Sequence, residues 1–328
     1  MEHNCKFHVK YDLHKFLLHS VFDFTLVVYN LIVTNEMEEI TMNNRIVKNS
    51  LCIAAAALML SACSASGSNA DEITVISRED GSGTRGAFVE LTGVEVKADD
   101  GSKTDLTYEE AIIANSTDVV MTQVSGNPYA IGYISLGSLN DTVKAVTIDG
   151  AAASQDNIKS GSYSLARPFN IAVKEGLSSQ SQDFIDYIMS VSGQQIIADN
   201  KYIPIDTDTE YTPSGTAGKI TVAGSSSVAP VMEKLAEGYK SLNPDAVIEV
   251  QQTDSTSGIK AVSDGTCDIG MASRDLKDSE LASGIIPSAI AMDGIAVIVS
   301  TENPVNNLSV EQIRQIFTGN ITSWGDVQ

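Results

Sequence analysis

Three times along this chain of 328 residues, a short β-branched apolar run leads into a turn rich in glycine and hydroxyl side chains, and then into the start of a helix. The turns are residues 77–85 (SREDGSGTR), 224–230 (GSSSVAP) and 253–258 (TDSTSG). The first N–H groups of a helix have no partner within the helix, and the helix dipole adds partial positive charge there. The pattern therefore predicts an α/β fold in which three helix starts converge on one small oxyanion.

The first turn carries the largest number of suitable groups. Gly81 and Gly83 allow the backbone to approach a ligand closely, and Arg78 offers a charge-assisted, forked donor. Asp80 lies two residues from Arg78 and is expected to hold its guanidinium in place. For this turn alone, a capped helix with a surface ion pair is an equally good interpretation.

Strand-like and helix-like patterns alternate along the rest of the chain, which favours largely parallel sheets with helices on both faces. Pro230 suits a first helical turn, and the residues after it continue a helical apolar stripe. Residues 183–197 read as a helix with a break at Gly193. The chain length suits two lobes better than one large domain.

Five further segments accompany the three turns: residues 131–136 (IGYISL), 268–274 (DIGMASR), 291–299 (AMDGIAVIV), 316–319 (IFTG) and 321–324 (ITSW). In combination they resemble the phosphate-binding lipoproteins of bacterial phosphate ABC transporters. The resemblance covers nearly everything from about residue 73 to the end. It implies a two-lobed, periplasmic-binding-protein-like fold of type II, with a ligand cleft between the lobes.

The order of these segments differs from that of the family. In the family the Gly-Ser-Ser segment opens the mature protein, and the Arg-Glu-Asp-Gly-Ser-Gly-Thr segment follows the Ile-Thr-Ser-Trp segment. Here the second half comes first, which predicts a circular permutation with new termini between Val327 and Ile73. The termini of a compact domain often lie close together, so such a change is physically easy. The alternative is a chimaeric or truncated gene model cut from a tandem array.

The resemblance also implies the division into lobes. Residues 165–292 form a continuous lobe, and residues 73–164 plus 293–328 form a split lobe. The chain then crosses between the lobes near residues 164–169 and again near 290–294. Residues 206–218, rich in Thr, Asp, Pro, Ser and Gly, are expected to be a solvated linker that joins the family's original ends.

Carried over position by position, the family's phosphate contacts come from both lobes. They fall on Arg78, Ser82, Gly83 and Thr84 of the split lobe and on Ser226, Ser227 and Ser255 of the continuous lobe.

One position departs from the family, in which many members place an Asp that accepts the proton of hydrogen phosphate. Ser273, Arg274 and Asp275 occupy that region here. Ser273 is expected to accept the proton weakly, Arg274 to add a positive contact, and Asp275 to serve as a substitute acceptor. An ion pair between Arg274 and Asp275 is the alternative. The departure leaves phosphate, sulfate and arsenate open as ligands.

The N-terminal region reads as a targeting segment. Residues 1–41 contain all four His and are interpreted as a mis-assigned upstream start, with a genuine extra anchor as the alternative. Residues 42–62 form a lipoprotein signal peptide, which ends in a cleavage box before Cys63. Cys63 would then carry the acyl chains, and residues 63–72 would be a tether. The resemblance implies a membrane-anchored protein on the extracytoplasmic face of a Gram-positive-type bacterium.

Composition excludes several other classes. Residues 1–62 carry five basic and six acidic residues, so the remaining chain has a net charge of −20 and is not expected to bind nucleic acid. This part of the chain has no His and only Cys267 besides Cys63, which predicts no disulfide framework, metal site or cofactor. Cys267 is expected to be a small core residue.

The sequence therefore predicts a monomeric solute-binding lipoprotein, and not an enzyme. By resemblance, it captures inorganic phosphate and delivers it to the permease subunits of an ABC transporter. Binding of another tetrahedral oxyanion such as sulfate is one alternative. A surface adhesion or scaffold lipoprotein with a vestigial cleft is another. The stretch Ser257-Gly258-Ile259-Lys260 matches the Ser-x-x-Lys pattern of penicillin-recognising enzymes, but none of that pattern's partner motifs accompanies it.

Overall fold

The computed structural model describes residues 71–98, 100–215 and 217–327. The predicted upstream segment, the signal peptide, the lipidation site Cys63 and most of the tether lie outside the described residues. Within the described ranges, no helix has both the length and the apolar character needed to cross a bilayer.

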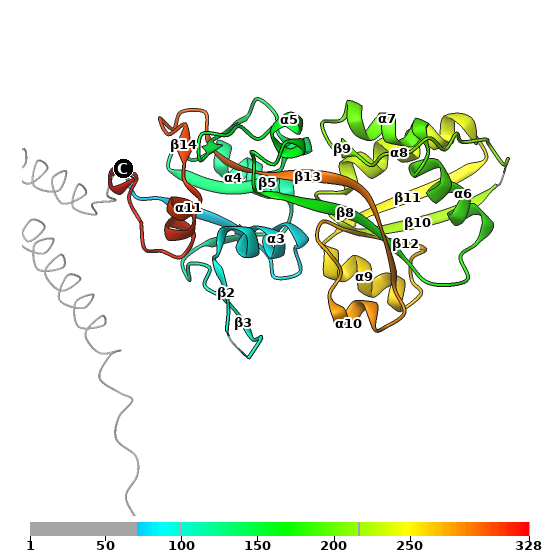
Figure 1. The fold of residues 1–328 in the computed structure, drawn as a ribbon, viewed down its shortest axis with the longest axis horizontal. Coiled ribbons are helices and arrows are strands. Elements are labelled where there is room, and N and C mark those ends of the chain that lie inside the picture. The colour runs from blue at the N-terminus through cyan, green and yellow to red at the C-terminus, as the bar shows by residue number, and fades with distance from the viewer. Residues whose placement is uncertain (1–70, 99, 216, 328) are drawn as a thin grey trace, which may run out of the picture. The chain divides into compact units, whose positions relative to one another are not determined.

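Short helices and strands alternate along the described chain (Figure 1). The helices are α3 (Gly83–Thr92), α4 (Thr117–Ser125), α5 (Gln155–Lys159), α6 (Ser179–Ile188), α7 (Val191–Asp199), α8 (Ala229–Leu242), α9 (Ser255–Ser263), α10 (Asp278–Leu281) and α11 (Val310–Phe317), with 3-10 turns η1 (Leu136–Ser138) and η2 (Trp324–Asp326). The strands are β1 (Thr74–Arg78), β2 (Glu95–Lys97), β3 (Lys103–Asp105), β4 (Ile112–Ala114), β5 (Ala130–Ser135), β6 (Val143–Ala145), β7 (Thr147–Ile148), β8 (Ala166–Val173), β9 (Ile203–Pro204), β10 (Gly218–Ser225), β11 (Ala246–Thr253), β12 (Ile269–Ala272), β13 (Ile286–Ser300) and β14 (Asn307–Leu308).

The main sheet has the strand order β11-β10-β12-β8-β13-β5-β1-β4. Its two ends are parallel, since β10 pairs in parallel with β11 and β12, and β1 with β4 and β5. The expectation of largely parallel sheets is wrong for its centre, where β8 and β13 run antiparallel to their neighbours. The first part of β13 pairs with β8 and its last part with β5, so these long strands join the two ends (Figure 1).

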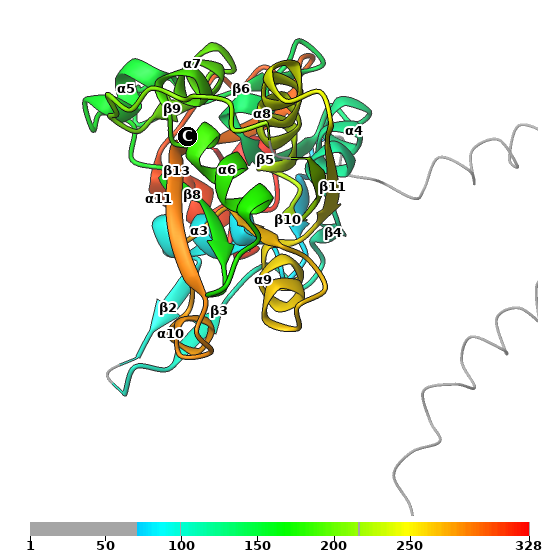
Figure 2. The same ribbon diagram turned by 90° about the vertical axis from the view of Figure 1, so that its right-hand side faces the viewer.

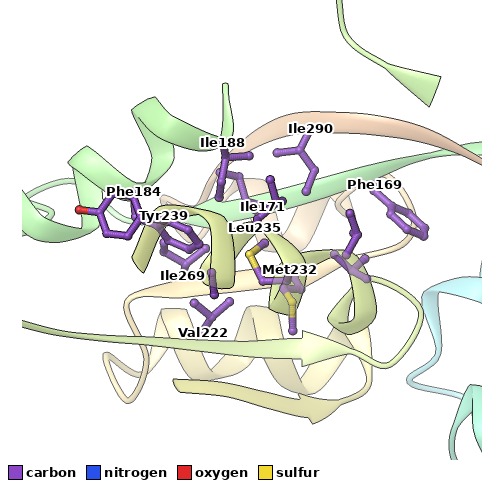
Figure 3. Close-up of a cluster of buried hydrophobic side chains, with 14 of the residues drawn as sticks. Phe169, Ile171, Phe184, Ile188, Val222, Met232, Leu235, Tyr239, Ile269 and Ile290 are labelled. Atoms are coloured by element: carbon purple, nitrogen blue, oxygen red, sulfur yellow. The ribbon is translucent and has the colours of Figure 1, made fainter. Parts of the chain in front are cut away.

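Separate hydrophobic cores fill the two ends of the sheet. One core consists entirely of residues between Phe169 and Ala291 (Figure 3). The other two draw only on residues up to Leu165 and from Ile295 onward. The two-lobed α/β fold class is therefore confirmed, while the exact lobe boundaries stay predictions. We use "continuous lobe" for the part built on the first core and "split lobe" for the part built on the others.

Helices cover both faces of the sheet in each lobe, as expected. In the continuous lobe, α6, α7 and α8 contribute to the main core, whereas α9 packs into a smaller cluster with Ala172 and Ala272 on the other face (Figure 2). In the split lobe, α3 and α11 share one core and α4 belongs to the other. Strands β1, β10 and β12 end near the boundary between the lobes, whereas β8 and β13 run across it.

The predicted helix break at Gly193 is wrong. The break falls at Met189 and Ser190, because Ser190 caps α7 by accepting a hydrogen bond from the Gly193 N–H. Gly193 lies inside α7 for a different reason. A Cβ atom there would come within 2.2 Å of the Tyr187 carbonyl oxygen, so glycine is needed for the close approach of α7 to α6.

The segment at 206–218 is mostly exposed, as a linker would be, but Tyr211 fastens it to the continuous lobe. Its ring packs edge-on against Tyr187, with the centroids 5.0 Å apart. Its hydroxyl donates to Asp183 Oδ2 and accepts from Asn243 Nδ2, each at 2.8 Å. The carbonyl oxygens of Thr209 and Ala217 also accept hydrogen bonds, from Val191 N and Gln180 Nε2, each at 2.9 Å, so the segment is docked on the lobe at several points.

The first and last described segments lie side by side. Ile73 N donates to the Thr322 carbonyl oxygen, and Trp324 N donates to that of Asp71, each at 2.8 Å. Glu72 and Ser323 form an antiparallel bridge between these two bonds. Segments from opposite ends of the described chain thus form one piece of structure.

Candidate functional site

Seven buried hydroxyl side chains meet where the two lobes touch. We call this group the hydroxyl cluster; its members, each 3% exposed or less, are Thr84, Thr117, Ser225, Ser226, Ser227, Ser255 and Ser273. Thr84 Oγ1 of the split lobe lies 2.8 Å from Ser227 Oγ of the continuous lobe. Within the continuous lobe, Ser225 Oγ donates to Ser273 Oγ at 2.9 Å. The three predicted turns are therefore brought together.

Helix starts surround this cluster and fix its members. Ser82 caps α3 by accepting from Arg85 N, and Asp254 caps α9 by accepting from Ser257 N. The start of α8 has no side-chain cap, and Pro230 lies in its first turn. The first N–H groups of these helices have no partner within their helices, and the helix dipoles place partial positive charge at the cluster.

Arg78 brings a full positive charge to the cluster from the end of β1. It is 2% exposed, and its Nη2 donates to Ser226 Oγ across the lobe boundary at 3.0 Å. The expectation that Asp80 holds this guanidinium is wrong. Glu79 does so with two hydrogen bonds of 2.7 Å, whereas Asp80 pairs with Arg85 at the surface. Glu79 and Asp80 are both close to Arg78 in the chain, and the directions of their side chains determine that Glu79 pairs with it.

Tyr133 supports Arg78 through the backbone. Its buried hydroxyl accepts a hydrogen bond from Arg78 N at 3.1 Å and lies 2.9 Å from Ser77 Oγ. Burial raises the pKa of Tyr133, so its hydroxyl stays protonated at neutral pH. Its ring stacks on that of Phe88 from α3, with the centroids 3.9 Å apart. The end of β1 and the start of α3 are thereby held together.

Gly83 lies directly against the opposite lobe. A Cβ atom added there would come within 2.4 Å of Ser255 Oγ and 2.7 Å of Ser273 Oγ. Its backbone φ is not in the left-handed region. Glycine is therefore needed at this position to let the lobes approach, and not for an unusual turn.

The proton-acceptor region differs from the expectation. Ser273 is fully buried in the hydroxyl cluster, but Asp275 is exposed to solvent and is not placed to accept a proton there. Arg274 does not form an ion pair with the Asp275 carboxylate. Its guanidinium donates to both oxygens of Glu280 at 2.8 Å and to the Asp275 carbonyl oxygen at 2.9 Å.

The Arg274–Glu280 pair forms a wall beside the cluster. Burial would raise the pKa of Glu280, but hydrogen bonds from Arg274 and from Lys277 N outweigh it and lower that pKa. The Arg274 side chain passes close to Gly83 and Gly86 of α3. Arg274 also lines a cavity of about 650 Å³, together with Gly86 of α3, Arg167 and Lys277. Arg274 thus adjoins both the hydroxyl cluster and this cavity.

Thr117 belongs to the cluster, although the motifs in the sequence did not point to it. It is the first residue of α4 and is 2% exposed. Its Oγ1 lies 3.2 Å from Ser227 Oγ and 3.4 Å from Ser226 Oγ. The sequence signal was present, because an apolar run at residues 112–114 leads into Asn-Ser-Thr and a helix start, but this turn lacks glycine.

A buried ion pair lies where β8 and β13 cross between the lobes. Arg167 Nη2 donates to Asp293 Oδ2 at 3.2 Å, and Ser135 Oγ donates to Asp293 Oδ1 at 2.9 Å. Burial raises the pKa of Asp293 to about 6, although Arg167 opposes this shift. Nε and Nη1 of Arg167 have no hydrogen-bond partner. The pair therefore carries a substantial desolvation penalty.

Other chemistry is poorly represented in the described part of the chain. No group of three or more His, Cys, Asp or Glu side chains there is arranged to hold a metal ion. Cys267 packs, half-buried, against the small cluster under α9, and burial raises the pKa of its thiol to about 11. Such a thiol is not activated as a nucleophile.

Comparisons with known proteins relate the chain to phosphate-binding proteins. A family model described as the PBP superfamily domain matches residues 36–192 and 209–328. The phosphate-binding protein PstS 2 of Streptococcus agalactiae is 50% identical over 272 residues, which cover 82% of this chain and 93% of that protein. PstS 2 of Streptococcus pneumoniae is 49% identical over 257 residues, which cover 78% of this chain and 88% of that protein.

A solved structure of a phosphate-binding protein is also similar to this chain. The crystal structure of a phosphate-binding protein of a phosphate ABC transporter from Streptococcus pneumoniae is 48% identical and superposes with a TM-score of 0.62. The match covers 78% of this chain and all of that one.

Proposed function

The chain belongs to the PBP superfamily and, within it, to the family of phosphate-binding proteins, and on that premise we propose that it captures inorganic phosphate for an ABC transporter. The observation that supports this most strongly is the hydroxyl cluster. Side chains from both lobes meet there at the starts of helices, with Arg78 as the cationic member. This is the chemistry that a small oxyanion requires.

Arg78, Ser82, Gly83, Thr84, Ser226, Ser227, Ser255 and Ser273 are the proposed phosphate contacts. Arg274 is proposed as a wall of the site rather than a direct contact, because its guanidinium bonds Glu280 and Thr256, which lie outside the cluster, whereas Arg78 also donates to Ser226 within it. The protein captures its ligand without chemistry, by closing the two lobes on it and presenting the closed form to the permease. It acts as a monomer anchored outside the cell through Cys63.

The net charge of the chain does not exclude anion binding. About six charge-assisted hydrogen bonds at roughly 1.5–3 kcal/mol each give on the order of 9–18 kcal/mol before the costs of association. A micromolar affinity needs only about 8 kcal/mol. Distant acidic groups at the surface are screened by salt, whereas these donors act at contact distance.

Calorimetric titration of the full chain with phosphate and, separately, with sulfate tests the proposal. Bound anion is first removed by dialysis in denaturant, followed by refolding. Micromolar phosphate binding with much weaker sulfate binding is the expected result. Equal binding of both would identify a general oxyanion site. Absence of binding to either, in a folded protein, would favour the scaffold alternative and overturn the proposal.

We also propose that the order of the two halves is a circular permutation. The pairing of residues 71–73 with residues 322–324 supports it, because a connection between these segments needs few residues. The alignment with PstS 2 of Streptococcus agalactiae runs through 93% of that protein, so this relative would share the permuted order. A variant that starts at residue 219, runs to 327 and continues through a short linker from 71 to 205 should fold and bind phosphate like the parent. Failure to fold would count against the permutation.

A further inference from the structure

We propose that Thr117 and the first turn of α4 form an additional part of the anion site, with the Thr117 hydroxyl in contact with a ligand oxygen. The inference rests on the proposed function and deepens it. It adds a second helix start on the side of the split lobe, which otherwise contributes only the turn at residues 77–85. The ligand class is the same tetrahedral oxyanion.

The position of Thr117 is the first argument. Its hydroxyl lies between Ser226 and Ser227, which are both proposed phosphate contacts on the opposite lobe. Ser227 in turn lies 2.8 Å from Thr84, another proposed contact. A group that touches this many members of the site from across the boundary lies within the site and not behind it.

The hydrogen bonding of Thr117 is the second argument. The two contacts of its buried hydroxyl measure 3.2 and 3.4 Å. Hydroxyl–hydroxyl bonds are usually about 2.7–2.8 Å long, and a buried polar group normally has a good partner. The bonding capacity of Thr117 is therefore poorly used by the protein itself. A charge-assisted bond to an anion oxygen would be roughly twice as strong as a neutral one.

The third argument is the helix that carries it. Ser116 caps α4 by accepting from Val119 N, so the N–H groups of Thr117 and Asp118 remain at the open end of a nine-residue helix. Val120 and Val124 of α4 are completely buried in a core that includes Ile76 of β1. Since β1 ends at Arg78, the start of α4 is held in register with the main cationic group.

Four helices then point their N-terminal ends at the cluster, α3 and α4 from the split lobe and α8 and α9 from the continuous lobe. Two dipoles act from each side, so the ligand's negative charge attracts both lobes. This arrangement predicts that loss of the α4 contact lowers affinity without preventing folding. Thr117 does not need to be buried by the ligand, because it is already buried.

The test is calorimetric titration of the full chain with phosphate, combined with thermal melting in the absence of ligand. Thr117→Val keeps the shape and removes the hydroxyl, and its Kd should rise at least tenfold. Thr117→Ser should retain most of the affinity. Thr122→Val is the matched control, because Thr122 lies on the same helix and its hydroxyl bonds only to the α4 backbone. It should bind like the wild type.

A double substitution distinguishes a direct contact of Thr117 with the ligand from a role limited to positioning Ser227. If Thr117 contacts the ligand, Thr117→Val should raise Kd further in a Ser227→Ala background; no further rise would overturn the inference. Wild-type affinity in Thr117→Val would also overturn it, while leaving the proposed function intact. Absence of binding in the wild type would overturn both. Should Thr117→Val not fold, Thr117→Cys replaces it, since a thiol of similar size is a weak donor.

Discussion

Replacing Gly83 by alanine tests whether the lobes must meet at the hydroxyl cluster. The new Cβ atom would lie 2.4 Å from Ser255 Oγ, 2.7 Å from Ser273 Oγ and 3.1 Å from Arg274 Cγ. Ordinary contact requires roughly 3.5 Å, so the lobes would have to separate by about 1 Å at this point. Alternatively, the two serine hydroxyls would have to turn away. Either response removes groups that are proposed to bind the ligand.

The expected loss of affinity follows from the two serine hydroxyls that would no longer reach the anion. Hydrogen bonds from hydroxyl groups to an anion are worth roughly 1.5–3 kcal/mol each, so phosphate Kd should rise by about 10²- to 10⁴-fold. The backbone geometry at Gly83 gives no reason for the ligand-free protein to become less stable when alanine replaces glycine. Gly83 lies at the first position of α3 with a backbone that alanine can adopt, and alanine favours a helix by up to about 1 kcal/mol over glycine.

The assay is titration calorimetry with phosphate, together with urea unfolding of the ligand-free protein. Gly86→Ala is the matched control on the same helix, because its Cβ would meet Arg274 Cδ at an ordinary 3.7 Å. The control should bind within a factor of about three of the wild type, by the usual tolerance of such substitutions. If Gly83→Ala binds phosphate as tightly as Gly86→Ala, phosphate binding does not require the close approach of Gly83 to Ser255 and Ser273.

Three further predictions concern the groups around the cluster. Arg78→Lys keeps the charge but loses the fork that reaches Glu79 and Ser226, so phosphate Kd should rise roughly ten- to hundredfold in calorimetry; an unchanged Kd would remove Arg78 from the site. Asp293→Asn leaves the buried Arg167 without its ionic partner and should cost about 3–5 kcal/mol in urea unfolding, whereas Arg167→Met with Asp293→Leu should recover most of that loss. Glu280 has a folded-state pKa below its ordinary 4.5, so its contribution to stability is present above that pH and is lost as the pH falls through the folded-state value. The difference in unfolding free energy between wild type and Glu280→Gln should therefore shrink on acidification. A difference that grows would contradict the assigned pairing with Arg274.

Much of the candidate site could be predicted from local patterns in the sequence. The turns at residues 77–85, 224–230 and 253–258 each read as a strand, a hydroxyl-rich turn and a helix start, and β1, β10 and β11 with α3, α8 and α9 lie there. These features depend on residues a few positions apart, through caps, β-branching and glycine. Such short-range physics is written directly in the chain.

The partner of each arginine could not be obtained in the same way, even where it lies close in the chain. The sequence offered Asp80 for Arg78 and Asp275 for Arg274, but the folded protein uses Glu79, which is adjacent to Arg78, and Glu280, which is six residues from Arg274. Thr117 joins Ser226 and Ser227 over more than a hundred residues. These choices depend on the directions of side chains and on how closely the lobes approach, and both are settled by packing.

The sequence by itself thus determined the class of the fold, the helix starts and the type of ligand they suit. Tertiary structure alone decided which carboxylate holds each arginine, that Asp275 faces solvent, and that α4 is a fourth helix directed at the cluster. The physical reason is the range of the interactions. Hydrogen bonding within a turn is fixed by neighbouring residues, whereas a site between two lobes exists only after strands β8 and β13 have joined the separate cores.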